Sequence, residues 1–207
     1  MLEQELWTRL KNGDQNALKS IYDQHYSNLC QYGLRLVTHT DIVEDAIQDV
    51  FVELWKYKSN LSETDSIKSY LFVCIKRKII KLVKDYQKHS SNEQIEEYFD
   101  AGYFENSLIS SEIVEEQNTK LKQAVSKLSK RQQEVLYLKF EEGLDYEQIS
   151  KIMDLKYQSV RNLVSTAIIK IKEHLTILSV IIFYFISTNL LNFTLNYISN
   201  DFRMIGK

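Results

Sequence analysis

The feature that most constrains the fold of this chain is the absence of proline from all 207 residues. Proline interrupts helices and fixes turns, so a chain without it can run through long helices with few rigid bends. Apolar residues make up 44% of the chain and charged residues 26%, a balance that can build cores and argues against collagen-like, low-complexity and wholly disordered classes. We therefore expect an all-α fold, with one large domain or two small ones.

Apolar residues at helical spacing predict three helices in the first half of the chain. Asp14 precedes the first helix as its cap, and Asp41 with Glu44 forms a capping pair for the second. A polar loop at residues 59–66 precedes the third. The predicted ranges are residues 17–37, 42–55 and 67–87. Because each helix carries an apolar stripe that needs a partner, we expect one helical domain at residues 10–90.

The second half begins with a stretch that lacks any sustained period. Residues 91–118 mix serine, asparagine and acidic residues, a composition typical of a flexible linker. A second helical domain is expected at residues 119–175. Its helix ends are marked by residues that cap or stop helices, namely Ser129, Gln132, Gly143, Asp145 and Gln148.

Within this second domain, a short helix, a tight turn at residues 154–156 and a longer helix follow one another. This order is the helix-turn-helix plan, in which the second helix enters the DNA major groove. The free face of the longer helix offers polar and basic side chains that can contact base edges and phosphates. They are Gln158, Ser159, Arg161, Asn162, Ser165, Lys170 and Lys172. The alternative is a plain two-helix hairpin with a polar outer face.

Charge is strongly segregated along a chain whose net charge is only −2. Residues 66–90 hold seven bases and one acid, residues 91–119 hold eight acids and no base, and residues 120–174 hold eleven bases and seven acids. Two basic pieces around an acidic one predict a two-part polyanion binder with a self-shielding linker. The alternative is a set of ordinary solvated helix faces.

Residues 128–175 resemble region 4, the promoter-reading domain of RNA polymerase sigma factors of the extracytoplasmic-function (ECF) class, in the sigma-70 family. The motif is carried by Leu128, Arg131, Gln132, Glu134, Val135, Gly143, Tyr146, Glu147, Ile149, Val160 and Arg161. Asp154 replaces the usual turn glycine, a change that is tolerable because Asp can adopt a left-handed conformation. Many response regulators have a similar DNA-binding domain, so this region alone leaves the class open.

The first half resembles region 2 of the same family. The sequence VEDAIQDVFVELW is similar to region 2.2, which docks on polymerase, and the matching residues are Asp45, Gln48, Asp49, Phe51 and Trp55. From the residues alone, its acidic and amide-bearing face suits a basic protein partner, or is merely solvated. We expect Phe51 and Trp55 to lie in the core rather than at a contact.

The basic helix at residues 67–87 is similar to regions 2.3 and 2.4, which melt and read the minus-ten element. The resemblance implies DNA contacts at Lys68, Tyr70, Lys76, Arg77 and Lys81. Tyr70, Arg77 and Lys81 depart from the family's usual tryptophan, asparagine and aspartate, and the added charge favours phosphate binding. Capture of a single strand needs a cationic surface and a pocket for an extruded base, and we place that pocket at the loop of residues 59–66.

The resemblance implies a sigma factor that binds core RNA polymerase and directs it to promoter DNA, with region 4 at the minus-thirty-five element and an anti-sigma factor as a further partner. We expect no enzyme activity, cofactor or metal site, because no catalytic or metal-ligand spacing occurs. The rival is a one-component helix-turn-helix regulator that acts without joining polymerase. A third alternative is a membrane-tethered signalling adaptor.

That third alternative rests on a hydrophobic tail at residues 176–207. No charge occurs between Leu175 and Asn200, so the tail predicts either a helix that packs on protein or a membrane contact. Cys30 and Cys74 lie in apolar runs and are expected in the core, in a reducing compartment. The charged N-terminus lacks the apolar core of a signal peptide, which predicts a cytoplasmic protein.

Overall fold

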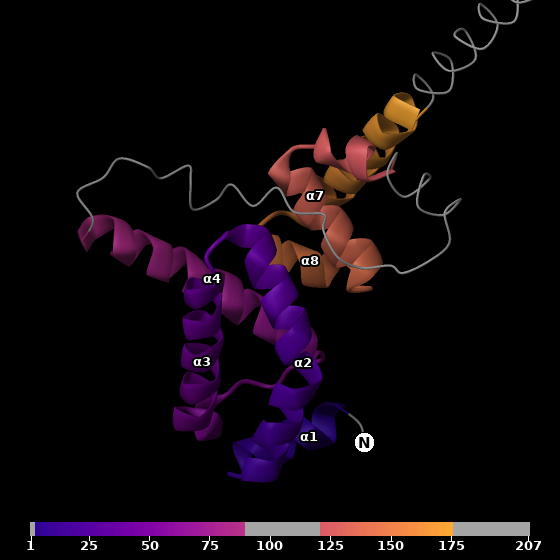
Figure 1. The fold of residues 1–207 in the computed structure, drawn as a ribbon. Helices are drawn as coiled ribbons and strands as arrows, with labels where there is room; N and C mark the ends of the chain where they lie inside the picture. Colours follow the sequence, from indigo (N-terminus) through magenta and orange to yellow (C-terminus); the bar gives the residue numbers. More distant parts are fainter. Residues whose placement is uncertain (1–2, 90–120, 176–207) are drawn as a thin grey trace, which may run out of the picture. The chain divides into compact units, whose positions relative to one another are not determined.

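The computed structural model describes residues 3–89 and 121–175, and no strand occurs within those ranges, so the all-α prediction is confirmed. Contacts divide the chain into two units, and Figure 1 shows the ribbon. The first unit contains residues 1–106 and 130–164, and the second contains residues 107–129 and 165–207. The predicted domain boundaries follow sequence composition and stay predictions. The contacts group the chain differently, because residues 130–164 pack with the helices of the first half.

The first half of the chain forms four α-helices and one 3₁₀ turn. They are α1 (Glu3–Lys11), α2 (Gln15–Leu36), α3 (Thr40–Lys56), η1 (Lys58–Asn60) and α4 (Ile67–His89). The three helices predicted from apolar periodicity are confirmed as α2, α3 and α4. The sequence analysis missed α1, a nine-residue helix that is too short to repeat its apolar pattern more than twice.

The apolar stripes of α2, α3 and α4 face one another and form the core of the first unit. Fully or almost fully buried residues include Ile21, Leu29, Ile42, Ala46, Ile47, Leu71, Ile75 and Ile79. Gly33 of α2 faces both α3 and α4. A Cβ atom on Gly33 would lie 2.5 Å from a methyl carbon of Val43 and 3.2 Å from the Cδ1 atom of Ile79. Only glycine therefore lets α2 approach both neighbours this closely.

Helix α1 holds the start of α4 in place. The indole Nε1–H of Trp7 donates to the carbonyl oxygen of Ser62 at 3.0 Å, and the Glu3 carboxylate accepts a hydrogen bond from the first amide of α4, that of Ile67, at 3.2 Å. Trp7 and Leu10 are fully buried. The first amides of a helix lack intrahelical partners, so an acid from α1 satisfies one of them for α4.

The predicted caps are confirmed for α2 and wrong for α3. Asp14 accepts hydrogen bonds from the amides of Asn16 and Ala17, at 2.8 and 3.4 Å. Helix α3 begins two residues earlier than predicted, at Thr40, so that His39 takes the cap position and makes no side-chain cap bond there. Asp41 instead lies inside the first turn, where its charge favours the positive end of the helix dipole.

The helix-turn-helix begins after a turn of unusual geometry. Helix α7 (Lys130–Leu136) continues into η2 (Tyr137–Glu141), a π-helical turn in which the amide of Glu142 donates to the carbonyl oxygen of Tyr137. Gly143 then ends the segment as predicted, with a φ of +69° that favours glycine.

The two helices that follow match the prediction. Helix α8 (Tyr146–Met153) ends at Asp154, which has a left-handed backbone with φ 53° and ψ 52°. The next helix starts at residue 157 and is described as far as residue 175. Left-handed Asp154 thus stands where the family's turn glycine is usual, as the sequence predicted.

The second unit is described at residues 121–129 and 165–175. A short helix at residues 121–126 buries Ala124 and Val125, and Leu128 and Ala167 are also buried. The predicted linker at residues 91–118 and the hydrophobic tail at residues 176–207 lie outside the described residues. Within the described part of the chain, every helix is too short or too polar to span a bilayer.

The capping box of α8 generates a stability prediction. The Asp145 carboxylate accepts from the amide of Gln148 at 2.8 Å, and the Gln148 side chain accepts from the amide of Asp145 at 3.0 Å. We expect Asp145→Ala to lower the free energy of unfolding by about 1 kcal/mol, because one orphan amide loses its acceptor. Asp145→Ser is the matched control, since its hydroxyl still accepts. Equal urea stability of the two variants would contradict a capping role.

Candidate functional site

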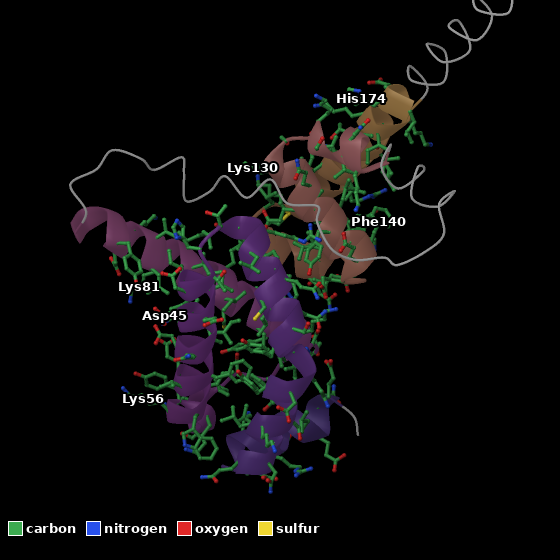
Figure 2. All side chains as sticks on the ribbon, in the orientation of Figure 1. Asp45, Lys56, Lys81, Lys130, Phe140 and His174 are labelled. Atoms are coloured by element: carbon green, nitrogen blue, oxygen red, sulfur yellow. The ribbon has the colours of Figure 1, made fainter. Side chains whose placement is uncertain are left out.

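The outer face of α3 carries the polar residues predicted to bind polymerase. Asp45, Gln48 and Asp49 are exposed, and Figure 2 shows Asp45 projecting from α3 on the side away from α2. Phe51 is 7% exposed and its ring contacts that of Tyr22 at 5.0 Å, so it lies in the core as expected. The outer face of α3 therefore presents two carboxylates and one amide to a partner. The Phe51 ring is not part of this face because it is buried.

Two other residues complete this part of α3. Trp55 is half-buried, and the Lys58 ammonium lies 4.3 Å from the centre of its ring. Val52 is 63% exposed, so it adds an apolar side chain one turn after Gln48. Sequence reasoning missed Val52. The only sign of an exposed Val52 in the sequence is its position relative to the apolar stripe of this helix. The stripe contains Phe51 and Leu54, which are buried, and it leaves position 52 on the outer face.

Lys78 of α4 connects α4 to the acidic face of α3. Its ammonium donates to the Glu53 carboxylate at 2.5 Å and lies 3.5 Å from the Asp49 carboxylate. Burial alone would lower the pKa of Lys78, but Glu53 and Asp49 outweigh it and raise the pKa above its usual value. Lys78 therefore stays charged and offsets part of the acidic charge of α3. The sequence analysis did not single it out.

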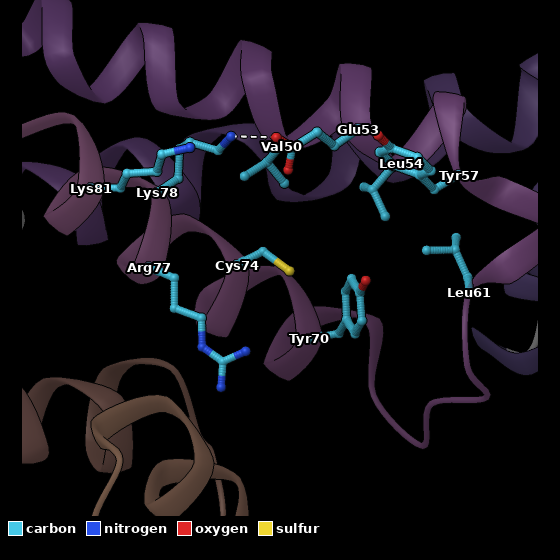
Figure 3. Close-up of a pocket in the computed structure, with 10 residues that line it drawn as sticks. All are labelled: Val50, Glu53, Leu54, Tyr57, Leu61, Tyr70, Cys74, Arg77, Lys78 and Lys81. Carbon is cyan, nitrogen blue, oxygen red and sulfur yellow. Dashed lines mark hydrogen bonds and ion pairs between the residues drawn. The ribbon is translucent and has the colours of Figure 1, made fainter. Parts of the chain in front are cut away.

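A pocket of about 350 Å³ lies between α3 and α4. Figure 3 shows Glu53 and Leu54 of α3 facing Cys74 and Tyr70 of α4, with Leu61 of the connecting loop at one end and the cations of α4 at the other. The lining residues are Val50, Glu53, Leu54, Tyr57, Leu61, Tyr70, Cys74, Arg77, Lys78 and Lys81. The pocket thus combines an aromatic and aliphatic end with a cationic end, and three of the predicted DNA-binding residues reach it.

The Tyr70 ring of this pocket is held in place by a second aromatic ring. Its ring packs edge to face on Trp7 at a centroid distance of 5.0 Å, which fixes it from the α1 side. Burial, together with the neighbouring Cys74 thiol, raises the pKa of Tyr70 to about 12. The phenol therefore remains protonated at neutral pH and can donate a hydrogen bond.

The loop at residues 59–66 contributes less to this pocket than the sequence analysis expected. Among its residues only Leu61 lines the pocket between α3 and α4. Thr64, Asp65 and Ser66 instead line a second hollow of about 590 Å³, whose other wall comes from α4 and α8. A loop can supply one side of a cavity, but the sequence does not reveal which helices close it.

The predicted DNA-binding cations of α4 fall into two groups. Arg77 and Lys81 are exposed and line the pocket between α3 and α4. Lys68 and Lys76 are half-buried, and their ammonium groups donate to the carboxylates of Glu142 and Glu134, at 2.5 and 2.7 Å. In this structure the second pair therefore contacts acids of the same chain.

The helix at residues 157–175 has the two faces that its periodicity predicted. Val160, Val164 and Ala167 are buried, whereas all seven predicted DNA-binding residues are exposed: Gln158, Ser159, Arg161, Asn162, Ser165, Lys170 and Lys172. The Gln158 amide donates to the Asn162 side chain at 3.0 Å, which orders two of these groups on one face. The face can offer donors and acceptors to base edges.

No group of three or more His, Cys, Asp or Glu side chains is placed to hold a metal ion within residues 3–89 and 121–175. Cys30 and Cys74 are free and half-buried. Burial raises the pKa of both thiols, so they stay protonated at neutral pH. These cysteines behave as packing residues rather than as nucleophiles.

Comparisons with known proteins match two separate parts of the chain. Residues 21–89 match the family model for sigma-70 region 2, and residues 118–171 match the model for sigma-70 region 4. The chain is 23% identical to RNA polymerase sigma factor YlaC of Bacillus subtilis (strain 168), over 78% of this chain and 93% of that one. It is 22% identical to RNA polymerase sigma factor SigZ of the same strain, over 75% and 85%.

Two solved structures share the fold. One is CnrH in complex with the cytosolic domain of CnrY, with a TM-score of 0.56 and 18% identity over 85% of this chain and 98% of that one. The other is the sigma factor RpoE of Bartonella quintana in complex with the anti-sigma factor NepR, with a TM-score of 0.54 and 19% identity over 76% and 96%. Since regions 2 and 4 match in one chain and together cover more than half of it, the chain belongs to the sigma-70 family of RNA polymerase sigma factors, in its extracytoplasmic-function class.

Proposed function

We propose that this sigma factor binds core RNA polymerase through the outer face of α3 and contacts promoter DNA through α4 and the helix at residues 157–175. The observation that carries the proposal is the presence of both sigma regions in one chain. A one-component helix-turn-helix regulator needs no region 2, so that alternative is not favoured. Sigma factors are regulatory subunits and not enzymes, and polymerase supplies the chemistry.

The direct test mixes the purified full chain with core polymerase. The proposal expects co-elution in size-exclusion chromatography and start-site-specific transcription that core polymerase alone does not give. A protein that binds DNA but neither co-elutes with polymerase nor directs initiation would be an operator-binding regulator. The protein acts in the cytoplasm under this proposal, because core polymerase and promoter DNA meet there.

An anti-sigma factor is a further proposed partner. Support comes from the fold shared with RpoE, which was solved with the anti-sigma factor NepR. The exposed polar face of α3 and the exposed face of the helix at residues 157–175 are both surfaces that such a partner could cover. Loss of core-polymerase binding on addition of a co-purifying protein would identify one.

We predict that core-polymerase binding depends on the outer face of α3. We expect Asp45→Arg with Gln48→Ala to weaken core-polymerase binding at least tenfold, because like charges brought together at an interface cost several kcal/mol and about 1.4 kcal/mol is already tenfold. Both side chains lie off the buried stripe, so the fold should be retained. Asp23→Arg with Gln24→Ala makes the same chemical change on exposed positions of α2 and is the matched control. Equal affinities of the two variants in a core-binding titration would remove α3 from the interface.

The second prediction concerns the pocket between α3 and α4. If its cationic end binds the backbone of a melted strand, Arg77→Ala and Lys81→Ala should each weaken binding of holoenzyme to a single-stranded minus-ten oligonucleotide. The slope of log affinity against log salt should fall by about 0.7 for each phosphate that the variant no longer binds. Lys19→Ala removes an exposed base from α2 and should leave the slope unchanged. A slope that is unaltered in all three variants would exclude this pocket from strand binding.

The third prediction concerns base reading by the helix at residues 157–175. Arg161 is exposed and its removal leaves the buried stripe intact. We expect Arg161→Ala to relax preference at one or two upstream base pairs by roughly 1 to 3 kcal/mol. Lys172→Ala should instead weaken binding about equally on all sequences, as removal of a phosphate-binding group does. Transcription from a set of single-base promoter variants checks both, and an unchanged ranking with Arg161→Ala would rule out base reading by Arg161.

A further inference from the structure

Helix α1 contacts the loop at residues 59–66 from outside the part of the chain that the region 2 family model matches. That match begins at residue 21, and α1 ends before it. The indole Nε1–H of Trp7 donates to the carbonyl oxygen of Ser62 at 3.0 Å, and the Trp7 side chain is fully buried. A buried donor that lost its acceptor would be costly, so this bond ties the loop backbone to α1.

The same indole also contacts the pocket between α3 and α4 from behind. Its ring packs edge to face on the Tyr70 ring, with the centroids 5.0 Å apart. Tyr70 lines the pocket, and so does Leu61, the residue before Ser62. Figure 3 shows Leu61 and the Tyr70 ring beyond Cys74, on the side away from Lys81. One buried side chain therefore holds both the loop backbone and the aromatic ring at the apolar end of the pocket.

Helix α1 is itself fixed to α2. Leu6 and Leu10 of α1 are buried at 5% and 0% exposure. The Arg9 guanidinium lies 2.7 Å from the carboxylate of Asp14, which caps α2, and the Asp14 amide donates to the Arg9 carbonyl oxygen at 3.0 Å. The position of α2 therefore determines the position of α1, and through α1 that of the loop.

A second contact from α1 fixes the point at which α4 begins. The Glu3 carboxylate accepts from the Ile67 amide at 3.2 Å, and the Ser66 hydroxyl accepts from the Ser69 amide at the same distance. Two of the first amides of α4 are thereby satisfied, one by α1 and one by the loop. Tyr70 lies in the first turn of α4, so the start of this helix determines where its ring lies.

From these contacts we propose that α1 is a positioning element for base recognition, in which Trp7 and Glu3 hold the apolar end of the pocket between α3 and α4 in the geometry that accepts one unpaired base of the promoter. The inference rests on the proposed function in one respect, that α4 binds the melted strand. Trp7 and Glu3 act through the loop and the Tyr70 ring, without touching the base.

The chemistry of the pocket fits one nucleotide. Arg77 and Lys81 supply positive charge for a phosphate, and the Tyr70 ring with Leu61 supplies a surface for the face of a base. The protonated Tyr70 phenol can donate a hydrogen bond to a base edge. A site of this kind distinguishes one base from another only while its walls are held within a fraction of an ångström. Residues that hold the walls therefore set how strictly the base is chosen.

The first test measures base preference in the holoenzyme. Start-site mapping with the wild-type chain and core polymerase gives the minus-ten sequence, and single-stranded oligonucleotides with each of the four bases at each minus-ten position are the probes. We expect Trp7→Phe to reduce the preference at one position about fivefold, because phenylalanine keeps a buried ring but leaves the Ser62 carbonyl without its donor. Preferences at the other positions should stay as in the wild type.

The controls separate positioning from a general loss of stability. A ratio of affinities for two bases does not depend on the fraction of folded protein, so Ile21→Val, which trims a fully buried side chain of α2, should keep every preference. Glu3→Ala should weaken the same preference as Trp7→Phe, and Glu3→Gln should restore it, since an amide oxygen still accepts from Ile67. Preferences that are unchanged in Trp7→Phe, or Glu3→Gln as impaired as Glu3→Ala, would overturn the positioning role.

The second test reads the pocket through its own thiol. Cys30 and Cys74 are both half-buried, and Cys74 is the one that lines the pocket. We expect Trp7→Phe to speed maleimide labelling of Cys74 in the free full chain about threefold, because a loosened wall opens more often, and to leave Cys30 unchanged. Peptide mass spectrometry measures both rates in one sample. In the holoenzyme, a bound minus-ten oligonucleotide should slow labelling of Cys74 and not of Cys30; equal rates at Cys74 with and without it would exclude a base from the pocket.

Failure of this inference can be told from failure of the proposed function. A holoenzyme that selects start sites, but in which Trp7→Phe leaves base preference unchanged, overturns the positioning role and keeps the sigma function. Faster labelling of Cys74 without a change in base preference has the same meaning, since Trp7 would then hold the pocket without serving recognition. A chain that never forms a holoenzyme loses the proposed function and the positioning role with it, while the labelling rate of Cys74 in the free chain still decides whether α1 holds the pocket.

Discussion

The close approach of α2, α3 and α4 at Gly33 is the constraint on which the first unit depends. A methyl group at this position would meet Val43 on one side and Ile79 on the other, so the helices can share one core only because position 33 has no side chain. Val43 belongs to α3, which carries the acidic face, and Ile79 belongs to α4, which carries the cations. The same two helices also line the pocket, with Glu53 and Leu54 on α3 and Cys74 on α4.

Most of the helices could be predicted from the sequence, because their apolar residues recur at a spacing that only a helix places on one face. The capping box at Asp145 and the left-handed Asp154 were also predictable, since each depends on a few neighbouring residues. Helix α1 was missed because nine residues give too little periodicity. Its value to the fold comes from Trp7 and Glu3 reaching residues about 60 positions away, which no local pattern reveals.

The candidate site also has features that the sequence predicts and features that depend on distant residues. Exposure of Asp45, Gln48 and Arg161 follows from their positions off an apolar stripe, so sequence alone identified those faces. The partners of Lys68 and Lys76 lie more than 50 residues away, at Glu142 and Glu134. A cation on a helix looks equally available in a sequence whether water or a carboxylate faces it. Only the tertiary contact tells which lysines are already paired with an acid of the same chain.

The π-helical turn at Tyr137–Glu141 has a consequence for how this chain can vary. Such a turn accommodates one more residue than an α-helical turn of the same length, so residues after it are rotated relative to a regular helix. Deleting a single residue here would restore α geometry and turn Glu142 by about 100° around the helix axis, away from Lys68 and Asn28. Substitutions within the turn can be absorbed by side-chain packing, but a change in its length cannot. The segment should therefore tolerate chemical diversity while keeping a fixed number of residues across relatives that share this contact.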